Sequence, residues 1–424
     1  MSKSSLQAPR GTRDSYPDDF RRREYLFGHF REIAKRFGFE EVDAPIVEHA
    51  ELFTRKAGEE IVDQLYHFEL HGRHLALRPE MTPSIARLVI ARAGGLRMPL
   101  RWFAVTQNWR YERMVRGRRR EHYQWNMDVW GEPEVTAEAE LISAIFSLLD
   151  ALELPRGAVK VRINSRALLE ESLRGGVLAT RPDAFAPLCV AIDKLDKIGE
   201  DAVIEQLTKP EPVGLSESEA RDVIAMLRAR DLDEAARHAP DDSKGLADLR
   251  RLFELLDAYG VAEHAVFDAS IVRGLAYYTG VVFEAFDAGG SLRSICGGGR
   301  YDRLSETLGG PAIPAVGFGF GDEVIGLLLS DHDLWPALDR PVDDLVYAFG
   351  EDERPHAIRV ATRLRAEGRR VELVLGRAKL KKVLSEANRG GVARLWLLGS
   401  DEVARGVAKV RDLATGEESE HPLT

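Results

Sequence analysis

Residues 109–131 read WRYERMVRGRRREHYQWNMDVWG and predict an antiparallel strand–loop–strand hairpin. In the second strand apolar and polar side chains alternate: Tyr123, Trp125, Met127 and Val129 against Gln124, Asn126 and Asp128. Successive side chains of a strand point to opposite faces, so the three polar groups share one face. A solvated face is the ordinary explanation of such a pattern. Because amides and a carboxylate occupy this face rather than lysines, we interpret it as the floor of a pocket.

The loop inside the hairpin is rich in arginine, with Arg116, Arg118, Arg119 and Arg120 close together. The net charge of the chain is −10, but affinity for phosphates depends on local basic patches. A run of arginines is often only a solvated face. Here the run interrupts two strand patterns, which favours a functional loop.

Composition narrows the class of protein. A chain of 424 residues exceeds the size of one core, so we expect two or three domains. The apolar fraction of 44% excludes general disorder. No apolar run is long enough for a membrane span, and the N-terminus lacks the apolar core of a signal peptide. With only Cys189 and Cys296, a disulfide scaffold or thiolate zinc site is not indicated. We expect a cytoplasmic protein.

The first 164 residues mix helices and strands. The expected helices are 19–37, 82–93 and 134–152, and the expected strands are 40–47 (interrupted by Pro45), 75–78, 100–112, 121–131 and 159–163. Charged, Ala- and Leu-rich helices fill residues 165–258. Strands return at 266–286, 291–296 and 315–319, followed by a helix at 322–330. This order predicts an α+β fold, an antiparallel domain interrupted by a helical insertion.

Residues 332–341 are polar, contain Pro336 and Pro341, and predict a linker. Strands and helices alternate after it, with strands expected at 345–349, 370–375, 395–398 and 407–412 and helices ending at 367 and 388. The pattern predicts a small α/β domain with a largely parallel sheet.

Two further segments carry candidate chemistry. Glu80 and Thr82 lie where RPEMT turns from a strand into a helix; Thr82 suits an N-cap, and the pair would also suit an ammonium group. Arg273 lies in an apolar stretch that predicts a strand. A buried unpaired arginine is costly, so it needs an acidic or phosphate partner or a strand end facing water. Tyr277 and Tyr278 are core aromatics or pocket walls.

Three successive glycines at 297–299 let a backbone approach a ligand, although such a run is more often a turn or bulge. The run fits neither a dinucleotide-binding nor a Walker pattern, so neither fold is supported.

Together these segments resemble histidyl-tRNA synthetase, a class II aminoacyl-tRNA synthetase, over nearly the whole chain. The matching pieces are RGTRD at 10–14, LRPEMT at 77–82, the hairpin, RGLAYYTG at 273–280, GGGRYD at 297–302 and PAVGFGFG at 314–321. Among these pieces, RGLAYYTG is close to diagnostic for this family and one histidine-biosynthesis paralogue.

The resemblance implies a class II antiparallel sheet flanked by helices. It implies a catalytic domain in two parts, 1–164 and 259–331, a helical insertion at 165–258 and an anticodon-binding α/β domain at 341–424. It also implies a homodimer with the segment around Pro45 at the interface.

The resemblance further implies a histidine–tRNA ligase that uses ATP and Mg²⁺, with histidine and histidine tRNA as partners and no protein metal ligand assigned. The implied histidine-binding residues are Glu80, Thr82, Gln124, Asp128, Tyr277 and Tyr278. Arg110 and Arg273 would flank the ATP α-phosphate as the catalytic residues, Glu112 would lie on the adenine side, and Arg118 would reach the distal phosphates. Arg116 and Arg120 would contact the tRNA acceptor end.

Three positions depart from the family pattern. Val324 stands where members carry an arginine that clamps ATP, and Val115 replaces a glutamine that in many members reads the extra 5′ guanosine of histidine tRNA. Ala276 replaces a common aspartate, a milder change.

Val324 leaves open a different class of protein, a non-catalytic paralogue that acts as regulatory subunit of ATP phosphoribosyltransferase. An RNA-binding regulator with a broken pocket is a third possibility. The C-terminal domain, with a basic face of Arg377, Lys379, Lys381 and Lys382, favours the ligase over the paralogue.

Overall fold

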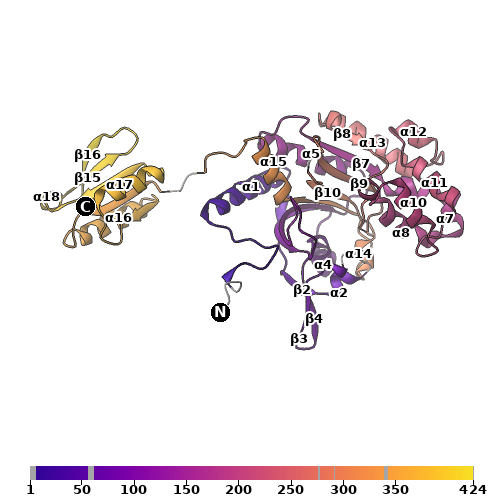
Figure 1. Cartoon of the computed structure of the whole chain (residues 1–424), viewed down its shortest axis with the longest axis horizontal. Helices are drawn as coiled ribbons and strands as arrows, with labels where there is room; N and C mark the ends of the chain where they lie inside the picture. Colours follow the sequence, from indigo (N-terminus) through magenta and orange to yellow (C-terminus); the bar gives the residue numbers. More distant parts are fainter. Residues whose placement is uncertain (1–5, 56–61, 276, 291, 339–341, 424) are drawn as a thin grey trace. The chain divides into compact units, whose positions relative to one another are not determined.

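The computed structural model describes residues 6–55, 62–275, 277–290, 292–338 and 342–423. The chain divides into two compact units, Met1–Trp335 and Pro336–Thr424 (Figure 1). We describe each unit by itself.

An eight-stranded sheet forms the centre of the larger unit, in the order β1-β5-β6-β11-β10-β9-β7-β8. Its strands are β1 (Glu40–Glu41), β5 (Leu100–Trp109), β6 (Glu121–Trp130), β7 (Val159–Ser165), β8 (Ala265–Phe267), β9 (Val281–Asp287), β10 (Cys296–Arg300) and β11 (Ala315–Gly321). The outermost pairs, β1–β5 and β7–β8, are parallel. The inner pairs are antiparallel. This confirms the predicted α+β class with an antiparallel sheet.

The predicted hairpin is confirmed as β5 and β6, which pair from Leu100↔Trp130 to Trp109↔Glu121. The first strand is shorter than expected, because Arg110 and Glu112 follow its end and lie in the loop. The alternation of side chains holds: Trp125, Met127 and Val129 are buried in one core beneath the sheet.

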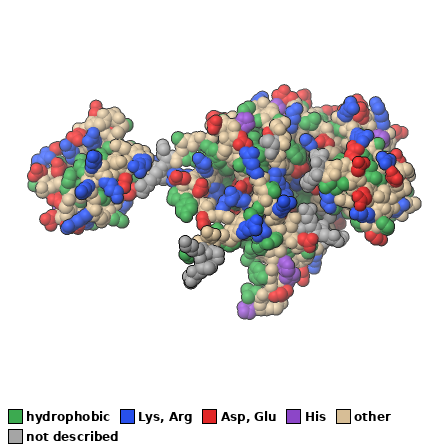
Figure 2. All heavy atoms as spheres, in the orientation of Figure 1, with side chains coloured by type: hydrophobic (Ala, Val, Ile, Leu, Met, Phe, Trp, Pro, Cys, Tyr) green, Lys and Arg blue, Asp and Glu red, His purple; other side chains and the backbone are tan. Residues whose placement is uncertain are grey.

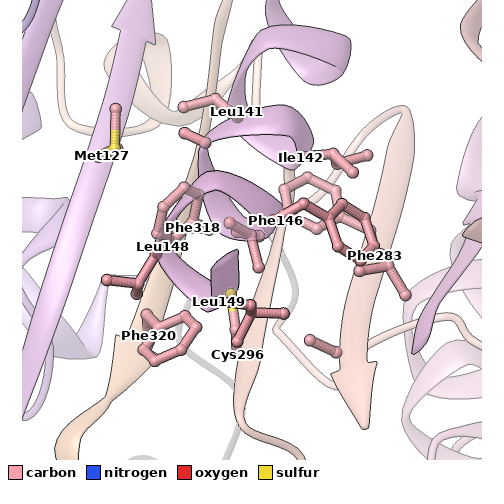
Figure 3. Close-up of a cluster of buried hydrophobic side chains, with 14 of the residues drawn as sticks. Met127, Leu141, Ile142, Phe146, Leu148, Leu149, Phe283, Cys296, Phe318 and Phe320 are labelled. Carbon is pink, nitrogen blue, oxygen red and sulfur yellow. The ribbon is translucent and has the colours of Figure 1, made fainter. Parts of the chain in front are cut away.

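That core lies between the sheet and two helices, α1 (Pro17–Arg36) and α5 (Thr136–Ala151). Figure 3 shows α5 side chains such as Leu148 and Leu149 facing Phe318 and Phe320 of β11, with Met127 of β6 and Phe283 of β9 beside them. Burying one such side chain contributes roughly 1.5–3 kcal/mol. The core therefore fixes one face of the sheet and leaves the polar face for a site.

The helix predicted at 82–93 is α4 (Thr82–Arg92). The strand expected at 40–47 is split around Pro45 into β1 and β2 (Val47–His49), and the strand expected at 75–78 is β4 (Arg73–Leu77). A short helix, α2 (Glu51–Thr54), and a strand, β3 (His67–Leu70), were not predicted. Strands β2, β4 and β3 form a separate three-stranded sheet, whose β3–β4 hairpin projects from the unit (Figure 1).

Residues 166–258 are helical, as predicted. The segment contains α6 (Arg166–Arg174), α7 (Val177–Thr180), α8 (Phe185–Ile192), α9 (Leu195–Ile198), α10 (Glu200–Thr208), α11 (Glu217–Met226), α12 (Leu232–Ala236) and α13 (Lys244–Ala258). Most of these helices share a second core, which runs from Leu169 to Leu227, and they gather at one end of the larger unit (Figure 1). Helix α13 differs, because Leu249, Leu252 and Leu256 are buried in the core with α5.

Two strand predictions are wrong. The stretch 266–286 forms strands only at its ends, β8 and β9, and residues 268–275 and 277–280 are a loop. Arg273 therefore does not lie in a strand; it lies in the loop with a left-handed backbone, φ 59°. The strand expected at 291–296 instead begins at Cys296, as β10. Residues 276 and 291, and with them the departure at Ala276, lie outside the described residues.

The glycines of β10 are explained by what lies against them. A Cβ on Gly297 would lie 2.4 Å from Cζ of Arg273, and a Cβ on Gly298 would lie 2.5 Å from the backbone oxygen of Gly317. The run is therefore neither a turn nor a bulge. It is a strand without side chains at these positions, so the Arg273 guanidinium can lie directly against its backbone.

Two helices complete the described part of the larger unit. Helix α14 (Leu304–Thr307) follows β10, and α15 (Asp322–Asp331) follows β11 as predicted. Short 3-10 turns occupy Ala93–Gly95, Pro182–Ala184 and Ala262–His264. None of the described helices has the length and apolar character needed to cross a membrane.

The smaller unit has a five-stranded sheet in the order β13-β12-β14-β15-β16. Its elements are β12 (Asp344–Ala348), α16 (Arg354–Ala366), β13 (Val371–Leu373), α17 (Leu380–Arg389), β14 (Arg394–Leu398), α18 (Ser400–Ala404), β15 (Val407–Asp412) and β16 (Glu418–Pro422). Strands β13, β12 and β14 are parallel, whereas β15 and β16 add antiparallel pairs. The expectation of a largely parallel sheet holds for only half of it, because β16, which was not predicted, turns back on β15.

Candidate active site

The polar face of the sheet is the floor of two adjoining cavities. The larger, about 410 Å³, is walled by Tyr277, Tyr278 and Tyr301, and we call it the tyrosine pocket. The smaller, about 170 Å³, contains five arginines, and we call it the arginine pocket: Arg110, Arg118, Arg119, Arg273 and Arg293. Figure 2 shows Lys and Arg side chains gathered on the middle of the visible face of the larger unit.

Glu80 lines the tyrosine pocket and is 7% exposed. Its Oε2 accepts a hydrogen bond of 2.9 Å from the Tyr277 hydroxyl. Burial raises the pKa of Glu80, and the charge of Arg110 and the Tyr277 hydrogen bond oppose that rise. Thr82 lines the same pocket, but it is the first residue of α4 and its side chain makes no cap, so the N-cap prediction is wrong.

Gln124 and Asn126 point into the tyrosine pocket from β6. The side chain of Gln124 is held by Asn108 of β5, whose Nδ2 donates to its Oε1 at 3.1 Å. Asn126 donates from Nδ2 to the Phe318 carbonyl at 3.4 Å. The neighbouring strands β5 and β11 thus fix the two amide groups of β6 on the pocket floor, the face that the alternation predicted.

Asp128 shares this face but lies deeper than expected, beneath Gly317, and is 1% exposed. One carboxylate oxygen accepts a hydrogen bond from the Tyr301 hydroxyl, and the other has no partner among the described residues. Burial raises the pKa of Asp128 to about 7, despite the Tyr301 hydrogen bond. Tyr301, not Asp128, therefore presents this pair to the pocket.

The three tyrosines pack on one another. Ring centroids are 5.0 Å apart for Tyr277 and Tyr278 and 5.8 Å apart for Tyr277 and Tyr301. Burial raises the pKa of Tyr278 to about 12 and the pKa values of the other two well above their ordinary value. All three hydroxyls stay protonated near neutral pH, so they can donate hydrogen bonds to a ligand or a carboxylate.

In the arginine pocket, carboxylates hold two of the predicted arginines. Arg273 Nη1 lies 2.5 Å from Oε1 of Glu284, and Arg118 is paired with Glu112. Burial alone would lower the pKa of Arg273, but Glu284 raises it above the ordinary value. The predicted need for an acidic partner at Arg273 is met by Glu284, from β9.

Arg110 is held by a backbone group rather than by a carboxylate. Its Nε donates to the Pro79 carbonyl at 2.9 Å, and its Nη1 lies 4.0 Å from Glu112 Oε1. The guanidinium is therefore fixed between Glu80 and Glu112, where both pockets meet.

His122 and Arg293 line the arginine pocket and were not among the predicted site residues. Burial and the charges of nearby arginines lower the pKa of His122 to about 3, so its ring is neutral. His122 could have been found, because it shares the polar face of β6 with Gln124. Arg293 could not, because it lies in an irregular loop with no periodic pattern.

The residues expected at a tRNA end lie outside both pockets. Arg116 is 58% exposed in its side chain and is paired with Asp331 at 3.0 Å. The Arg120 guanidinium lies 3.6 Å from the ring centroid of Tyr111. Val115, which stands for the guanosine-reading glutamine, is exposed in the same loop.

Val324 is 5% exposed and belongs to the apolar core, while one side of it borders the arginine pocket. No cation projects from this position of α15. The pocket nevertheless combines several fixed guanidinium groups with a polar, carboxylate-bearing neighbour. That arrangement suits a polyanionic ligand next to a small polar one.

Family comparisons agree with this geometry. A histidyl-tRNA synthetase family model matches residues 11–324, and an anticodon-binding-domain model matches residues 345–424. The chain is 47% identical over 423 residues to the chloroplastic/mitochondrial histidine–tRNA ligase of Arabidopsis thaliana, covering 100% of this chain and 86% of that protein. It is 38% identical to the histidine–tRNA ligase of Opitutus terrae, covering 99% of this chain and 96% of the relative.

Solved structures show the same fold. Histidyl-tRNA synthetase from Nostoc sp. PCC 7120 superposes with a TM-score of 0.76 at 24% identity, over 98% of this chain and 97% of that one. An ATP phosphoribosyltransferase regulatory subunit/histidyl-tRNA synthetase from Bacillus halodurans superposes with a TM-score of 0.73 at 25% identity, over 90% of this chain and 96% of that one.

Proposed function

The chain belongs to the histidyl-tRNA synthetase family, and we propose that its two pockets join histidine to ATP and then to the 3′ end of histidine tRNA. Membership makes it an aminoacyl-tRNA synthetase, a ligase of protein biosynthesis. The observation that carries the proposal is the tyrosine pocket meeting the arginine pocket at Arg110.

Histidine occupies the tyrosine pocket. Its ammonium group lies near Glu80, Thr82 and Gln124, which offer a carboxylate, a hydroxyl and an amide oxygen. Its ring meets the tyrosine walls and the Tyr301 hydroxyl, whose proton Asp128 holds. Buried polar partners for a ring reject apolar amino acids strongly, because an apolar ring would leave those partners unpaired.

ATP occupies the arginine pocket, with Arg110 and Arg273 on either side of its α-phosphate. Glu112 lies on the adenine side, and Arg118 reaches the distal phosphates. A histidine carboxylate oxygen attacks the α-phosphorus, the bond to the β-phosphate oxygen breaks, and pyrophosphate leaves. No protein nucleophile takes part, so the arginines act by positioning and by stabilising the charge that builds on the phosphoryl oxygens.

Mg²⁺, which the family implies, is bound mostly by phosphates and water in sites of this kind. Glu112 and Glu284 supply hard oxygen ligands on the pocket wall and fit such an ion. The ion would neutralise part of the triphosphate charge. In the described residues no group of three or more His, Cys, Asp or Glu side chains could hold a metal without the nucleotide.

The transfer step uses the tRNA 3′-terminal hydroxyl, which attacks the acyl carbonyl and releases AMP. Arg116 and Arg120 lie at the mouth of the hairpin loop and suit contact with the acceptor end. In the smaller unit, Lys379, Lys381 and Lys382 at the start of α17 form a basic face for an RNA backbone. We assign the anticodon to this unit, and keep the four-part division 1–164, 165–258, 259–331 and 341–424 as a proposal.

We also propose that the protein is a homodimer in the cytoplasm. Apolar side chains beside Pro45 are exposed on the small three-stranded sheet: Ile46, Val47, Phe68 and Leu70. A neighbouring protomer would cover them. Both cysteines are free and buried, which suits a reducing compartment.

The deciding experiment is ATP–pyrophosphate exchange with the purified chain. We expect exchange only when histidine is present. The regulatory-subunit reading, in contrast, predicts histidine binding without any exchange, so a silent assay with saturable histidine binding would replace the ligase proposal. Aminoacylation of histidine tRNA transcripts with and without the extra 5′ guanosine then tests the role of Val115.

A further inference from the structure

The arginine pocket holds more positive charge than its carboxylates neutralise. Arg118 is paired with Glu112, Arg273 with Glu284, and Arg119 with Glu323. Glu323 and its neighbour Asp322 also bind Arg13. Each acidic side chain that lines this pocket is thus already paired with Arg13, Arg118, Arg119 or Arg273.

Arg293 is the arginine of this pocket that has no such partner. Within the described part of the chain, no carboxylate lies within 4.0 Å of its guanidinium. Its side chain is exposed, yet it lines both pockets. Partial burial and the charge of Arg118 lower its pKa, and Glu112 and Glu284 only partly oppose this. An arginine so placed is ready to bind an anion.

The loop holds Arg293 in place from its C-terminal side. Ile295 is 2% exposed, its N–H donates to the Ala285 carbonyl at 2.8 Å, and its carbonyl accepts from Gly321 at 3.0 Å. Two residues beyond Arg293 the chain is therefore fixed between β9 and the end of β11. This fixes the backbone on the C-terminal side of Arg293 beside the pocket that its side chain lines.

Arg293 and Val324 meet at one point of the hairpin loop. A Cβ on Gly117 would lie 3.4 Å from Cγ2 of Val324 and 3.9 Å from Cδ of Arg293. The Arg293 stem and the Val324 side chain therefore lie against the same glycine of the hairpin loop. A guanidinium supplied from either position would reach the same part of the arginine pocket, which both residues line.

We propose that Arg293 binds the distal phosphates of ATP beside Arg118, supplying from the loop the cation that Val324 does not supply from α15. The inference rests on the proposed function and names a residue that positions ATP for the same reaction. It explains how α15 can place an apolar side chain at the edge of a phosphate site.

Arg293→Ala tests this role in histidine-dependent ATP–pyrophosphate exchange. One hydrogen bond to a charged group contributes about 1.5–3 kcal/mol, so the KM for ATP should rise about 10- to 150-fold. The KM for histidine should change less than about threefold. Arg293→Lys should recover part of the loss, because it keeps the charge without the fork. Arg303→Ala, an exposed arginine outside both pockets, is the matched control and should leave both constants unchanged.

A second variant tests whether residue 324 and Arg293 can supply the same cation. Val324→Arg should weaken ATP binding while Arg293 is present, and it should restore ATP binding in the Arg293→Ala background. Each single change would then be partly cancelled by the other, which is the sign of coupling in a double-mutant cycle. If the double variant does not bind ATP more tightly than Arg293→Ala, the idea that Arg293 supplies the cation in place of residue 324 is overturned.

The outcomes separate this inference from the proposed function. Wild-type protein without histidine-dependent exchange would remove the ligase proposal. Wild-type exchange together with an unchanged KM for ATP in Arg293→Ala would remove only the inference. A parallel rise in both KM values would assign Arg293 a structural role and also overturn it. If Arg293→Ala turns over too slowly for kinetics, the rise in melting temperature on adding ATP can be compared between wild type and variant instead. Arg293→Gln then serves as the second variant.

Discussion

At position 273 the chain holds an arginine in a left-handed backbone conformation, lying on Gly297 and paired with Glu284. A non-glycine residue with positive φ is strained, and such strain persists where the surroundings demand it. We expect Arg273→Ala to lower kcat/KM for exchange by at least about 100-fold, the usual cost of removing one group that stabilises developing charge. Exchange kinetics measure this directly.

The control for Arg273 is histidine binding. Calorimetry should give a Kd for histidine within about threefold of wild type, because Arg273 touches the phosphate side of the site. Equal losses of histidine affinity and turnover would mean that Arg273 only supports the fold of the loop. Near-normal turnover would mean that its catalytic assignment is wrong.

Asp128 gives the site a pH dependence near neutrality, because burial raises its pKa to about 7. Below pH 7 the carboxyl is protonated and holds the Tyr301 proton less well, so the hydroxyl accepts the histidine ring N–H less well. Histidine itself is protonated with a pKa of about 6.5 when free. Affinity for histidine should therefore fall as the pH drops, more steeply than the roughly one decade per pH unit that protonation of histidine alone would give.

Asp128→Asn separates the two titrations. The amide does not titrate, so the slope should fall to about one decade per pH unit, set by histidine alone. Calorimetric Kd values between pH 5.5 and 8 measure both slopes. An unchanged slope in the variant would show that Asp128 does not sense ligand binding.

For single residues, the sequence predicted which side chains share a face better than it predicted which side chains pair with one another. The period-2 pattern put Gln124, Asn126 and Asp128 on one face, and the structure agrees. Glu284 could not be matched to Arg273, because the loop between them follows no periodic rule. For the same reason Arg293 could not be predicted from the sequence. The depth of Asp128 depends on Gly317, which pairs with it from the neighbouring strand β11 but lies far away in the sequence.

At the scale of elements, the glycine strand β10 makes two neighbouring substitutions behave differently. A Cβ on Gly297 would meet the movable end of Arg273, so Gly297→Ala should displace the guanidinium and lower exchange about as much as Arg273→Ala does. A Cβ on Gly298 would meet the backbone of Gly317. Gly298→Ala should therefore destabilise the fold by about 1–3 kcal/mol or more, the cost of overpacking.

Denaturant unfolding and exchange kinetics distinguish these two variants. Gly297→Ala should unfold within about 1 kcal/mol of wild type, and Gly298→Ala should lose stability first. The reverse order would mean that Arg273 is held too rigidly to move, and that the sheet yields instead.

Elements with a clear period were predicted well, including α1, α4, α5 and the β5–β6 hairpin. The failures share one physical cause. The stretch around Arg273 resembles a strand but is a loop at residues 268–275 and 277–280, and β10 resembles a turn but is a strand. In both places a contact between the two segments, Arg273 on Gly297, decides the conformation, and local propensity does not.

At the scale of the whole molecule, the polar segment with Pro336 was correctly read as a boundary, since the two compact units divide at residues 335 and 336. The assignment of helices to an insertion was harder. Helix α13 has the same amphipathic texture as its neighbours, yet its leucines enter the core with α5. An apolar stripe shows that a helix is covered and not which core covers it.

The homodimer proposal gives the last test. Phe68 and Leu70 of β3 are 41% and 49% exposed, next to Ile46 and Val47, on a hairpin that projects from the larger unit (Figure 1). Burying such side chains against a partner stabilises association, and burying a charge there opposes it. Phe68→Glu with Leu70→Glu should therefore shift sedimentation from dimer to monomer, whereas Leu375→Glu, at an apolar residue 83% exposed in the smaller unit, should not. A wild-type chain that sediments as a monomer would contradict the homodimer proposal. A double variant that stays dimeric would place the interface elsewhere.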